Sequence, residues 1–130
     1  MLKRLLLANV LLAAIATSAL ADDLRLEGAA GFLSEWRLSG KIQETAVNAR
    51  RQLSGSLTME HIGLCTHDGP NEKVASLKID AIGPRPASRI QGALVFDGAE
   101  CKFSGILTDN YSGFMTCPNA PGIPLSFSAK

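Results

Sequence analysis

The chain has 130 residues, with 13 lysines and arginines against 12 aspartates and glutamates. This length suits a single domain and excludes a doubly wound nucleotide-binding enzyme or a (β/α)8 barrel, because both need far more chain. The nearly balanced charge offers no electrostatic footprint for nucleic acid or for an anionic membrane surface.

The first residues have the three-part layout of a secretory signal peptide. A positive start at residues 1–4 precedes an apolar run at 5–16, and small residues follow at Ala19 and Ala21, the positions that signal peptidase reads. The apolar run is shorter than the roughly 20 residues of a membrane-spanning helix, which argues against a retained anchor. We therefore expect cleavage after Ala21 and a mature single domain of residues 22–130. That domain would lie in the periplasm or outside the cell, with no stable membrane insertion.

Glycine and proline punctuate residues 22–130 so often that several long helices are excluded, and short strands joined by turns are favoured. Apolar and polar residues alternate between the turns, as in half-buried strands. We expect strands within 33–44, 49–62, 74–82, 90–96, 101–107, 111–117 and 125–129. Turns are expected near Asn48, at Asp97-Gly98 and at Asp109-Asn110. Residues 22–32 are expected to form one short helix or an irregular lead-in.

An apolar-Ser-Gly triplet occurs four times in or beside these strands, starting at Leu38, Leu53, Phe103 and Tyr111. Glycine weakens a strand unless the sheet bends sharply or another chain segment comes close. Ser-Gly is also a common dipeptide, so chance recurrence is the competing explanation. The pattern predicts an all-β fold, a small antiparallel β-barrel or barrel-like sandwich of about seven or eight strands.

Three cysteines, Cys65, Cys101 and Cys117, remain after the leader. In an oxidising compartment two of them should pair and leave one thiol over, with three pairings open. Cys101 and Cys117 flank the Asp109-Asn110 turn at almost equal distances, and with an odd-numbered loop they would face each other directly. A bridge from Cys65 would close a longer loop and stabilise more in the chain-entropy model. We expect Cys65–Cys101, narrowly ahead of Cys101–Cys117.

The densest polar cluster comprises His61, Cys65, His67 and Asp68, and it holds both histidines of the chain. Imidazole, thiolate and carboxylate are the usual ligands of zinc and copper. The spacing fits no established metal motif, however, and a disulfide cysteine with ordinary loop histidines is the favoured interpretation. Metal binding by His61, Cys65 and His67 stays as an alternative, and no cofactor is predicted.

Motifs of catalysis are absent from the sequence. There is no phosphate-binding glycine loop, no Gly-x-Ser-x-Gly elbow and no His-Glu-x-x-His helix. A Cys65/His67 nucleophile pair would lack an orienting third group, and an oxidising compartment would inactivate an exposed thiolate. We therefore expect a protein that is not an enzyme.

Recognition loops are the better candidates for function. Loops 63–71 and 83–89 are stiffened by proline, which lowers the ordering cost of binding, and the turn at 108–112 adds a third segment. The only tryptophan, Trp36, is expected to point into the core, and the only tyrosine, at position 111, is expected at a barrel rim. The candidate binding residues are Asp68, Asn71, Arg85, Arg89, Asp109 and Tyr111.

The segment Leu33-Ser34-Glu35-Trp36-Arg37-Leu38-Ser39-Gly40 resembles the tryptophan-centred opening strand of bacterial periplasmic metalloprotease inhibitors, which are small eight-stranded barrels. The size and the leader are also similar to those of periplasmic lysozyme inhibitors. The resemblance covers under a tenth of the mature chain. The early cysteine pairing of the first family and the Ser-Gly-x-x-Tyr element of the second are both missing, so we assign the chain to neither.

The sequence thus predicts a non-enzymatic periplasmic or secreted binding protein with a protein partner, and inhibition of a hydrolase is the most concrete form of this function. The alternatives are a metal-handling protein and a structural envelope protein. No interaction with nucleic acid is expected.

Overall fold

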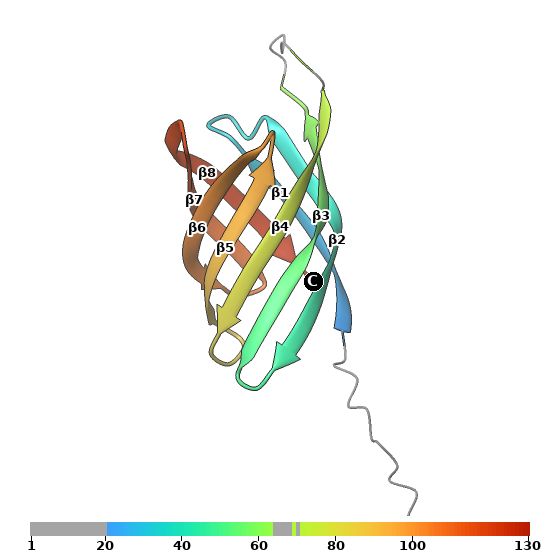
Figure 1. The fold of residues 1–130 in the computed structure, drawn as a ribbon, viewed down its shortest axis with the longest axis vertical. Helices are drawn as coiled ribbons and strands as arrows, with labels where there is room; N and C mark the ends of the chain where they lie inside the picture. Colours follow the sequence, from blue (N-terminus) through green and yellow to red (C-terminus); the bar gives the residue numbers. More distant parts are fainter. Residues whose placement is uncertain (1–20, 64–68, 70) are drawn as a thin grey trace, which may run out of the picture.

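The computed structural model describes residues 21–63, 69 and 71–130, so the predicted leader lies almost entirely outside the described residues (Figure 1). No helix in the described part is long and apolar enough to cross a membrane. The described residues form eight strands: β1 Ala21–Ala30, β2 Trp36–Val47, β3 Arg50–His61, β4 Glu72–Ile82, β5 Ser88–Phe96, β6 Ala99–Leu107, β7 Asn110–Cys117 and β8 Ala120–Ala129.

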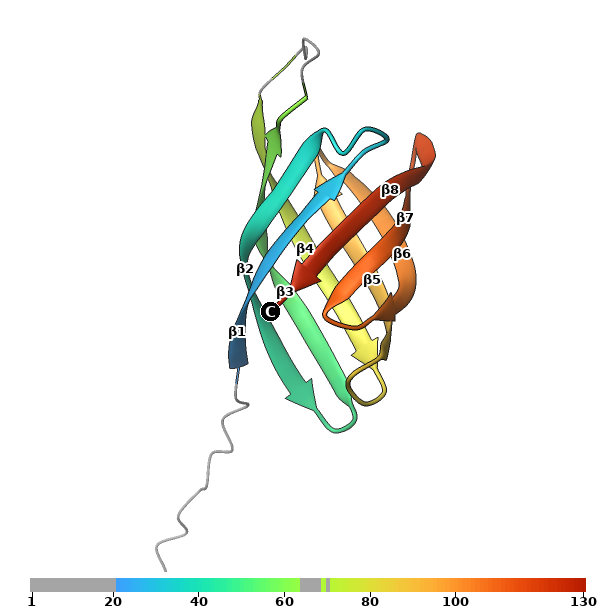
Figure 2. The ribbon, with the colours of Figure 1, turned by 180° about the vertical axis from the view of Figure 1, so that it is seen from behind.

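The strands close into one barrel. Each strand pairs antiparallel with the next along the chain, and β1 pairs antiparallel with β8, so that the sheet has no open edge (Figure 2). This confirms the predicted all-β fold and decides for a barrel over a sandwich. The turns predicted at Asn48 and Asp97-Gly98 are also confirmed, with positive φ at all three residues, as tight hairpin connections require.

Strand β1 corrects the expectation of a short helix or irregular lead-in at residues 22–32. Its inward row is Leu24, Leu26, Gly28 and Ala30, so only two large apolar side chains mark its alternation. The small inward residues let neighbouring chain segments come close: a Cβ at Gly28 would collide with the backbone of β8. Residues 21–30 therefore form a strand because they pair with β2 and β8, although their own alternation of apolar and polar residues is weak.

Side chains fill the interior of the barrel. Alternate residues of all eight strands point inward, as the period of two predicts. The buried apolar residues form one continuous core: Leu26, Ala30, Leu38, Ile42, Leu53, Leu57, Met59, Ala75, Leu77, Ile79, Ala81, Ile90, Leu94, Cys101, Phe103, Leu107, Tyr111, Met115, Leu125 and Phe127. The described interior of the barrel is thus a packed core.

Inward glycines make room for the large rings of this core. A Cβ at Gly92 would collide with the ring of Phe103. The ring of Tyr111 lies over Gly105 and Gly113, where an added Cβ would come within 2.9 and 2.5 Å of its atoms. The Ser-Gly triplets therefore mark close approach inside a strongly curved sheet, as predicted.

A disulfide joins Cys101 on β6 to Cys117 on β7. The expected Cys65–Cys101 bridge is therefore wrong, and Cys65 itself lies outside the described residues. The two bonded cysteines stand opposite each other with their Cα atoms 4.2 Å apart, close to the short spacing of directly facing antiparallel residues. The cysteines that lie next to each other in the folded sheet are the ones that pair. The longer loop that a Cys65–Cys101 bridge would close affects only the entropy of the unfolded chain.

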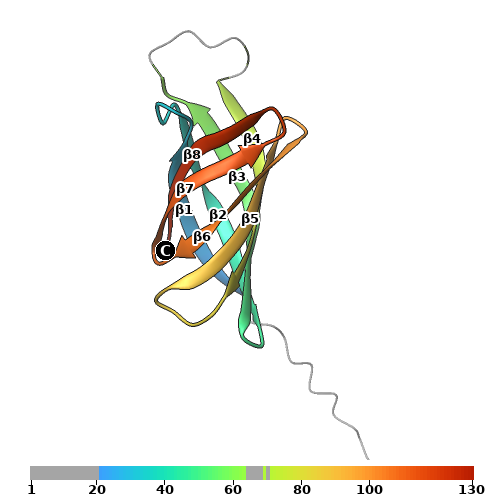
Figure 3. The ribbon, with the colours of Figure 1, turned by 90° about the vertical axis from the view of Figure 1, so that its left-hand side faces the viewer.

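The connections between the strands gather at the two ends of the barrel (Figure 3). The connection 31–35, the adjoining ends of β3 and β4, and the turns 97–98 and 118–119 lie at one end, which we call the Trp36 end. The turn 48–49, the loop 83–87 and the turn 108–109 lie at the opposite end, which we call the Arg85 end. The up-and-down strand order places alternate connections at alternate ends.

Candidate functional site

Two of the three predicted recognition segments meet at the Arg85 end. Arg85 and Pro86 from one loop and Thr108 and Asp109 from the next turn line a cavity of about 130 Å³. The strands that flank the third segment, 63–71, adjoin at the opposite end of the barrel, and most of that segment lies outside the described residues. Of its candidate residues, Asp68 lies outside the described part, and Asn71 is exposed, with its carbonyl accepting the His61 amide at 2.7 Å.

A buried carboxylate organises the Arg85 end. Glu44 points inward from β2 and is only 7% exposed. Nη2 of Arg85 donates to both carboxylate oxygens at 2.7 and 2.8 Å, and Nη1 of Arg51 donates to one of them at 3.3 Å. Arg51 also donates to the hydroxyl of Ser88, which in turn donates to the carbonyl of Gly83 at 3.2 Å.

The two guanidinium groups set the charge state of this cluster. Burial acts to raise the pKa of Glu44, but the hydrogen bonds and charges of Arg85 and Arg51 together outweigh it and hold the pKa below its ordinary value. Among the described residues, every buried side-chain nitrogen or oxygen has a partner. The cluster is therefore already satisfied within the chain, and it closes and stabilises this end of the barrel.

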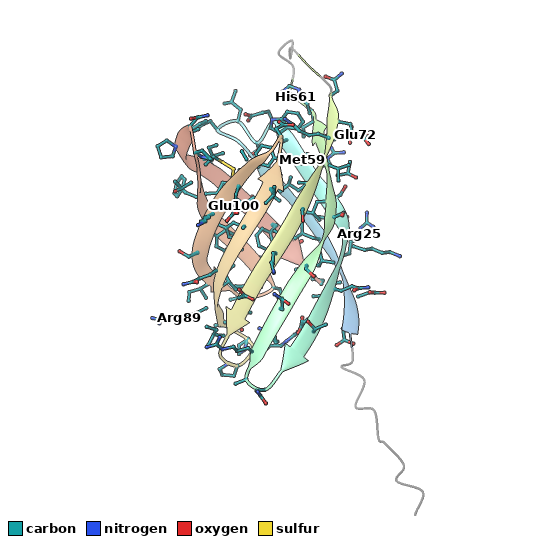
Figure 4. All side chains as sticks on the ribbon, viewed as in Figure 1. Arg25, Met59, His61, Glu72, Arg89 and Glu100 are labelled. Atoms are coloured by element: carbon teal, nitrogen blue, oxygen red, sulfur yellow. A yellow bond between two sulfur atoms is a disulfide. The ribbon has the colours of Figure 1, made fainter. Side chains whose placement is uncertain are left out.

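The remaining predicted binding residues at this end differ in exposure, so they do not form one site. Arg89 and Asp109 are exposed, and Arg89 points away from the barrel (Figure 4). Tyr111 is only 3% exposed, so the expectation of a rim residue is wrong. The turn takes only residues 108–109, which puts Tyr111 inside β7 on its inward row. Its hydroxyl donates to the carbonyl of Ser104 at 3.2 Å, and burial raises its pKa.

The connection between β1 and β2 at the Trp36 end is a small, tied loop. The Glu35 carboxylate accepts the backbone amide of Leu33 at 2.9 Å, and the Ser34 amide donates to the carbonyl of Gly31 at 3.1 Å. Gly31 has a φ of 106°, and a Cβ there would collide with the Glu35 carboxylate. Only glycine combines a positive φ with the absence of a Cβ, so Gly31 allows the loop to pack directly against the Glu35 carboxylate.

Backbone hydrogen bonds also fix this loop to its neighbours. The Gly31 amide donates to the carbonyl of Pro124 at 3.0 Å, and the Ile62 amide donates to the carbonyl of Glu35 at 2.8 Å. The loop nevertheless presents two large apolar side chains to solvent, Phe32 at 72% and Leu33 at 83% exposure. An ordered loop with exposed apolar residues is typical of a recognition element, because its ordering cost is met before binding.

An apolar pocket of about 180 Å³ opens beneath this loop. The side chains of Trp36, Met59, Phe96, Met115 and Ile123 line it together with the loop residues 30–32 and Glu35. Trp36 packs against the core as predicted, although it is only partly buried. Met59 and His61 lie toward this end in Figure 4.

A cation already lies against the aromatic side chains of this end. The ammonium of Lys73 is 4.3 Å from the ring centroid of Trp36 and 5.5 Å from that of Phe96, and it pairs with Asp97 at 2.6 Å. The ring of His61 meets Trp36 edge-on, with centroids 5.0 Å apart. The aromatic faces thus contact a positive group, as their quadrupoles favour.

Only part of the predicted metal cluster belongs to the described residues. Cys65 and His67 lie outside the described residues, and His61 is the one proposed ligand that the structure describes. Within the described residues, no three histidine, cysteine, aspartate or glutamate side chains gather in a metal-binding arrangement. The metal hypothesis therefore stays a prediction.

Sequence reasoning missed the loop 31–35, the buried Glu44 and the pairing of Lys73. A signal for the loop was present, since Phe32 and Leu33 are adjacent apolar residues that break the alternation after a glycine. Glu44 and Lys73 occupy inward positions of their strands, but Arg85 and Asp97 reach them from connections 41 and 24 residues away, and these pairings leave no local pattern.

Comparison with protein-family models, with curated proteins and with solved structures finds no match for this chain.

Proposed function

We propose that the protein is an exported, non-enzymatic binding module that recognises a protein partner through its Trp36 end. Inhibition of a hydrolase is the concrete form that we favour. The exposed Phe32–Leu33 pair on a hydrogen-bonded loop carries the proposal. Its apolar side chains can be buried by a partner, and its backbone is held in place beforehand.

The packed interior supports this location. Small-molecule carriers built on eight-stranded barrels need room inside, and side chains fill that room here. The cavity of about 130 Å³ beside Arg85 is closed by a satisfied ion cluster. The two most exposed large apolar side chains of the described residues, Leu33 and Phe32, lie side by side at the Trp36 end, which favours this end for burial by a partner.

The leader-like residues 1–21 support export. An exported chain with a disulfide and a rigid apolar loop is suited to meet an enzyme outside the cytoplasm. Such a loop could occupy an active-site cleft and exclude substrate.

The experiment is a comparative capture. Protein expressed from the full chain is immobilised through a tag after Lys130, which lies away from the Trp36 end (Figure 3). Periplasmic and extracellular fractions of the source cell are passed over it, and retained proteins are quantified by mass spectrometry. A retained hydrolase is then purified, and its activity is measured with and without the protein.

Matched variants make the capture specific. We expect a partner that the wild type and Ile106→Ser retain and that the double variant F32S/L33S loses. Ile106 is 54% exposed on the barrel wall toward the Arg85 end, so it controls for loss of exposed apolar area. Retention of the same proteins by all three would refute recognition through the Trp36 end. Full hydrolase activity in the complex would refute inhibition.

A further inference from the structure

The pocket at the Trp36 end has room for a single side chain. Its 180 Å³ corresponds to about six water volumes. It falls short of the roughly 300 Å³ at which pockets for drug-sized ligands begin. A slender group of a larger partner is therefore the appropriate occupant.

The lining combines a long apolar wall with one carboxylate. Trp36, Phe96, Met59, Met115 and Ile123 supply aromatic, thioether and aliphatic surface. Among the described residues that line the pocket, Glu35 is the only charged one, and it is half-buried. A carboxylate beside an apolar wall matches a side chain with an aliphatic stem and a cationic head.

The charge at this end favours a cation. Among the described residues, the Glu35 carboxylate lines the pocket with one negative charge, and the Lys73–Asp97 pair beside the aromatic wall is neutral as a pair. Because Asp97 pairs with Lys73 at 2.6 Å, the repulsion between the Lys73 ammonium and a second cation is offset. Lys73 itself shows that the rings of Trp36 and Phe96 accept a positive group.

We propose that this pocket binds an arginine or lysine side chain of the partner, with the stem against the aromatic and methionine wall and the cationic head on the Glu35 carboxylate. Phe32, on the same loop, forms the lip of the pocket. This inference rests on the proposed function, because it names the chemistry of the group that the partner inserts at the Trp36 end.

The methionines provide a direct readout. The chain has three, Met1, Met59 and Met115, and the last two line the pocket. Protein carrying methyl-labelled methionine is titrated with n-butylguanidinium, with n-butylammonium and with the neutral n-pentanol, and the methyl shifts of Met59 and Met115 are followed by NMR. No partner is needed, so this titration and the capture can fail independently.

We expect the two cations to shift both pocket methyls in a saturable manner, with a Kd about tenfold lower than that of n-pentanol, as a charge-assisted hydrogen bond provides. In Glu35→Gln, whose amide oxygen still accepts the Leu33 amide, the Kd of the cations should rise about tenfold to that of the alcohol. Glu72→Gln is the matched control, an exposed carboxylate on β4 outside the pocket lining, and it should keep the preference.

Three results of the titration would overturn the proposal. The first is binding of n-pentanol as tight as that of the cations, which would make the pocket a purely apolar anchor. The second is an unchanged preference for the cations in Glu35→Gln. The third is the absence of any shift of Met59 and Met115 up to the solubility limit of the probes. A partner that F32S/L33S loses but Glu35→Gln retains at full affinity would leave the proposed function standing and refute this inference.

Discussion

Removing the Cys101–Cys117 disulfide should cost the barrel much of its stability. The bridge joins residues 16 apart in the chain. In the chain-entropy model, a loop of this length corresponds to about 3 kcal/mol of unfolding free energy. The bridge also lies beside the one residue pair that defines the register between β6 and β7, Lys102 opposite Thr116.

The test compares the wild type with C101A/C117A, both carrying Cys65→Ala so that no alternative bridge can form. Urea unfolding followed by circular dichroism should give an unfolding free energy lower by about 3 kcal/mol and a thermal midpoint lower by about 12 °C. Amides of β6 and β7 should exchange with solvent faster than those of β2–β4. A loss under about 1 kcal/mol, or equal exchange in both regions, would refute the reasoning.

Two further substitutions probe the packing and charge of the interior. Gly92→Ala should destabilise by about 1–3 kcal/mol in urea unfolding, because its Cβ would meet the Phe103 ring, and a change within about 0.5 kcal/mol would contradict the packing argument. Glu44→Gln should cost about 2–3 kcal/mol near pH 7, since Arg51 and Arg85 would lose their carboxylate. The folded-state pKa of Glu44 is depressed, so its contribution is present above the unfolded-state pKa near 4.5 and is lost as the pH falls through the folded-state value. Thermal midpoints of wild type and Glu44→Gln should therefore converge on acidification, and a difference that is independent of pH would refute the assignment.

Most strands and turns were predictable from the sequence because the signals that define them are local. Alternation at residues 74–82 and the Asp97-Gly98 turn each reflect a short-range preference of the backbone, and both are confirmed. Strand β1 was missed because its inward row ends in Gly28 and Ala30, and its pairing with β8 brings together residues about a hundred positions apart. No local pattern carries information about such a closure.

The candidate site was harder to predict from the sequence, because it also depends on residues far apart in the chain. Whether Arg85 is free or paired depends on Glu44, which is 41 residues away and buried on another strand. Tyr111 was misplaced because it was expected beside the turn, whereas β7 already begins at Asn110 and Tyr111 stands on the buried row of that strand. The disulfide was misassigned because loop length in the unfolded chain was weighed above proximity in the folded sheet.

The most direct test of recognition at the Trp36 end is the affinity of the captured partner for two variants, one at each end of the barrel. Calorimetry with purified partner should show the Kd rising at least tenfold in F32S/L33S, because both side chains are largely exposed and available for burial. The same measurement on Arg85→Ala, at the opposite end, should leave the Kd within about twofold of the wild type. A loss of affinity confined to Arg85→Ala would contradict the account and would place recognition at the loops 83–89 and 108–112 instead.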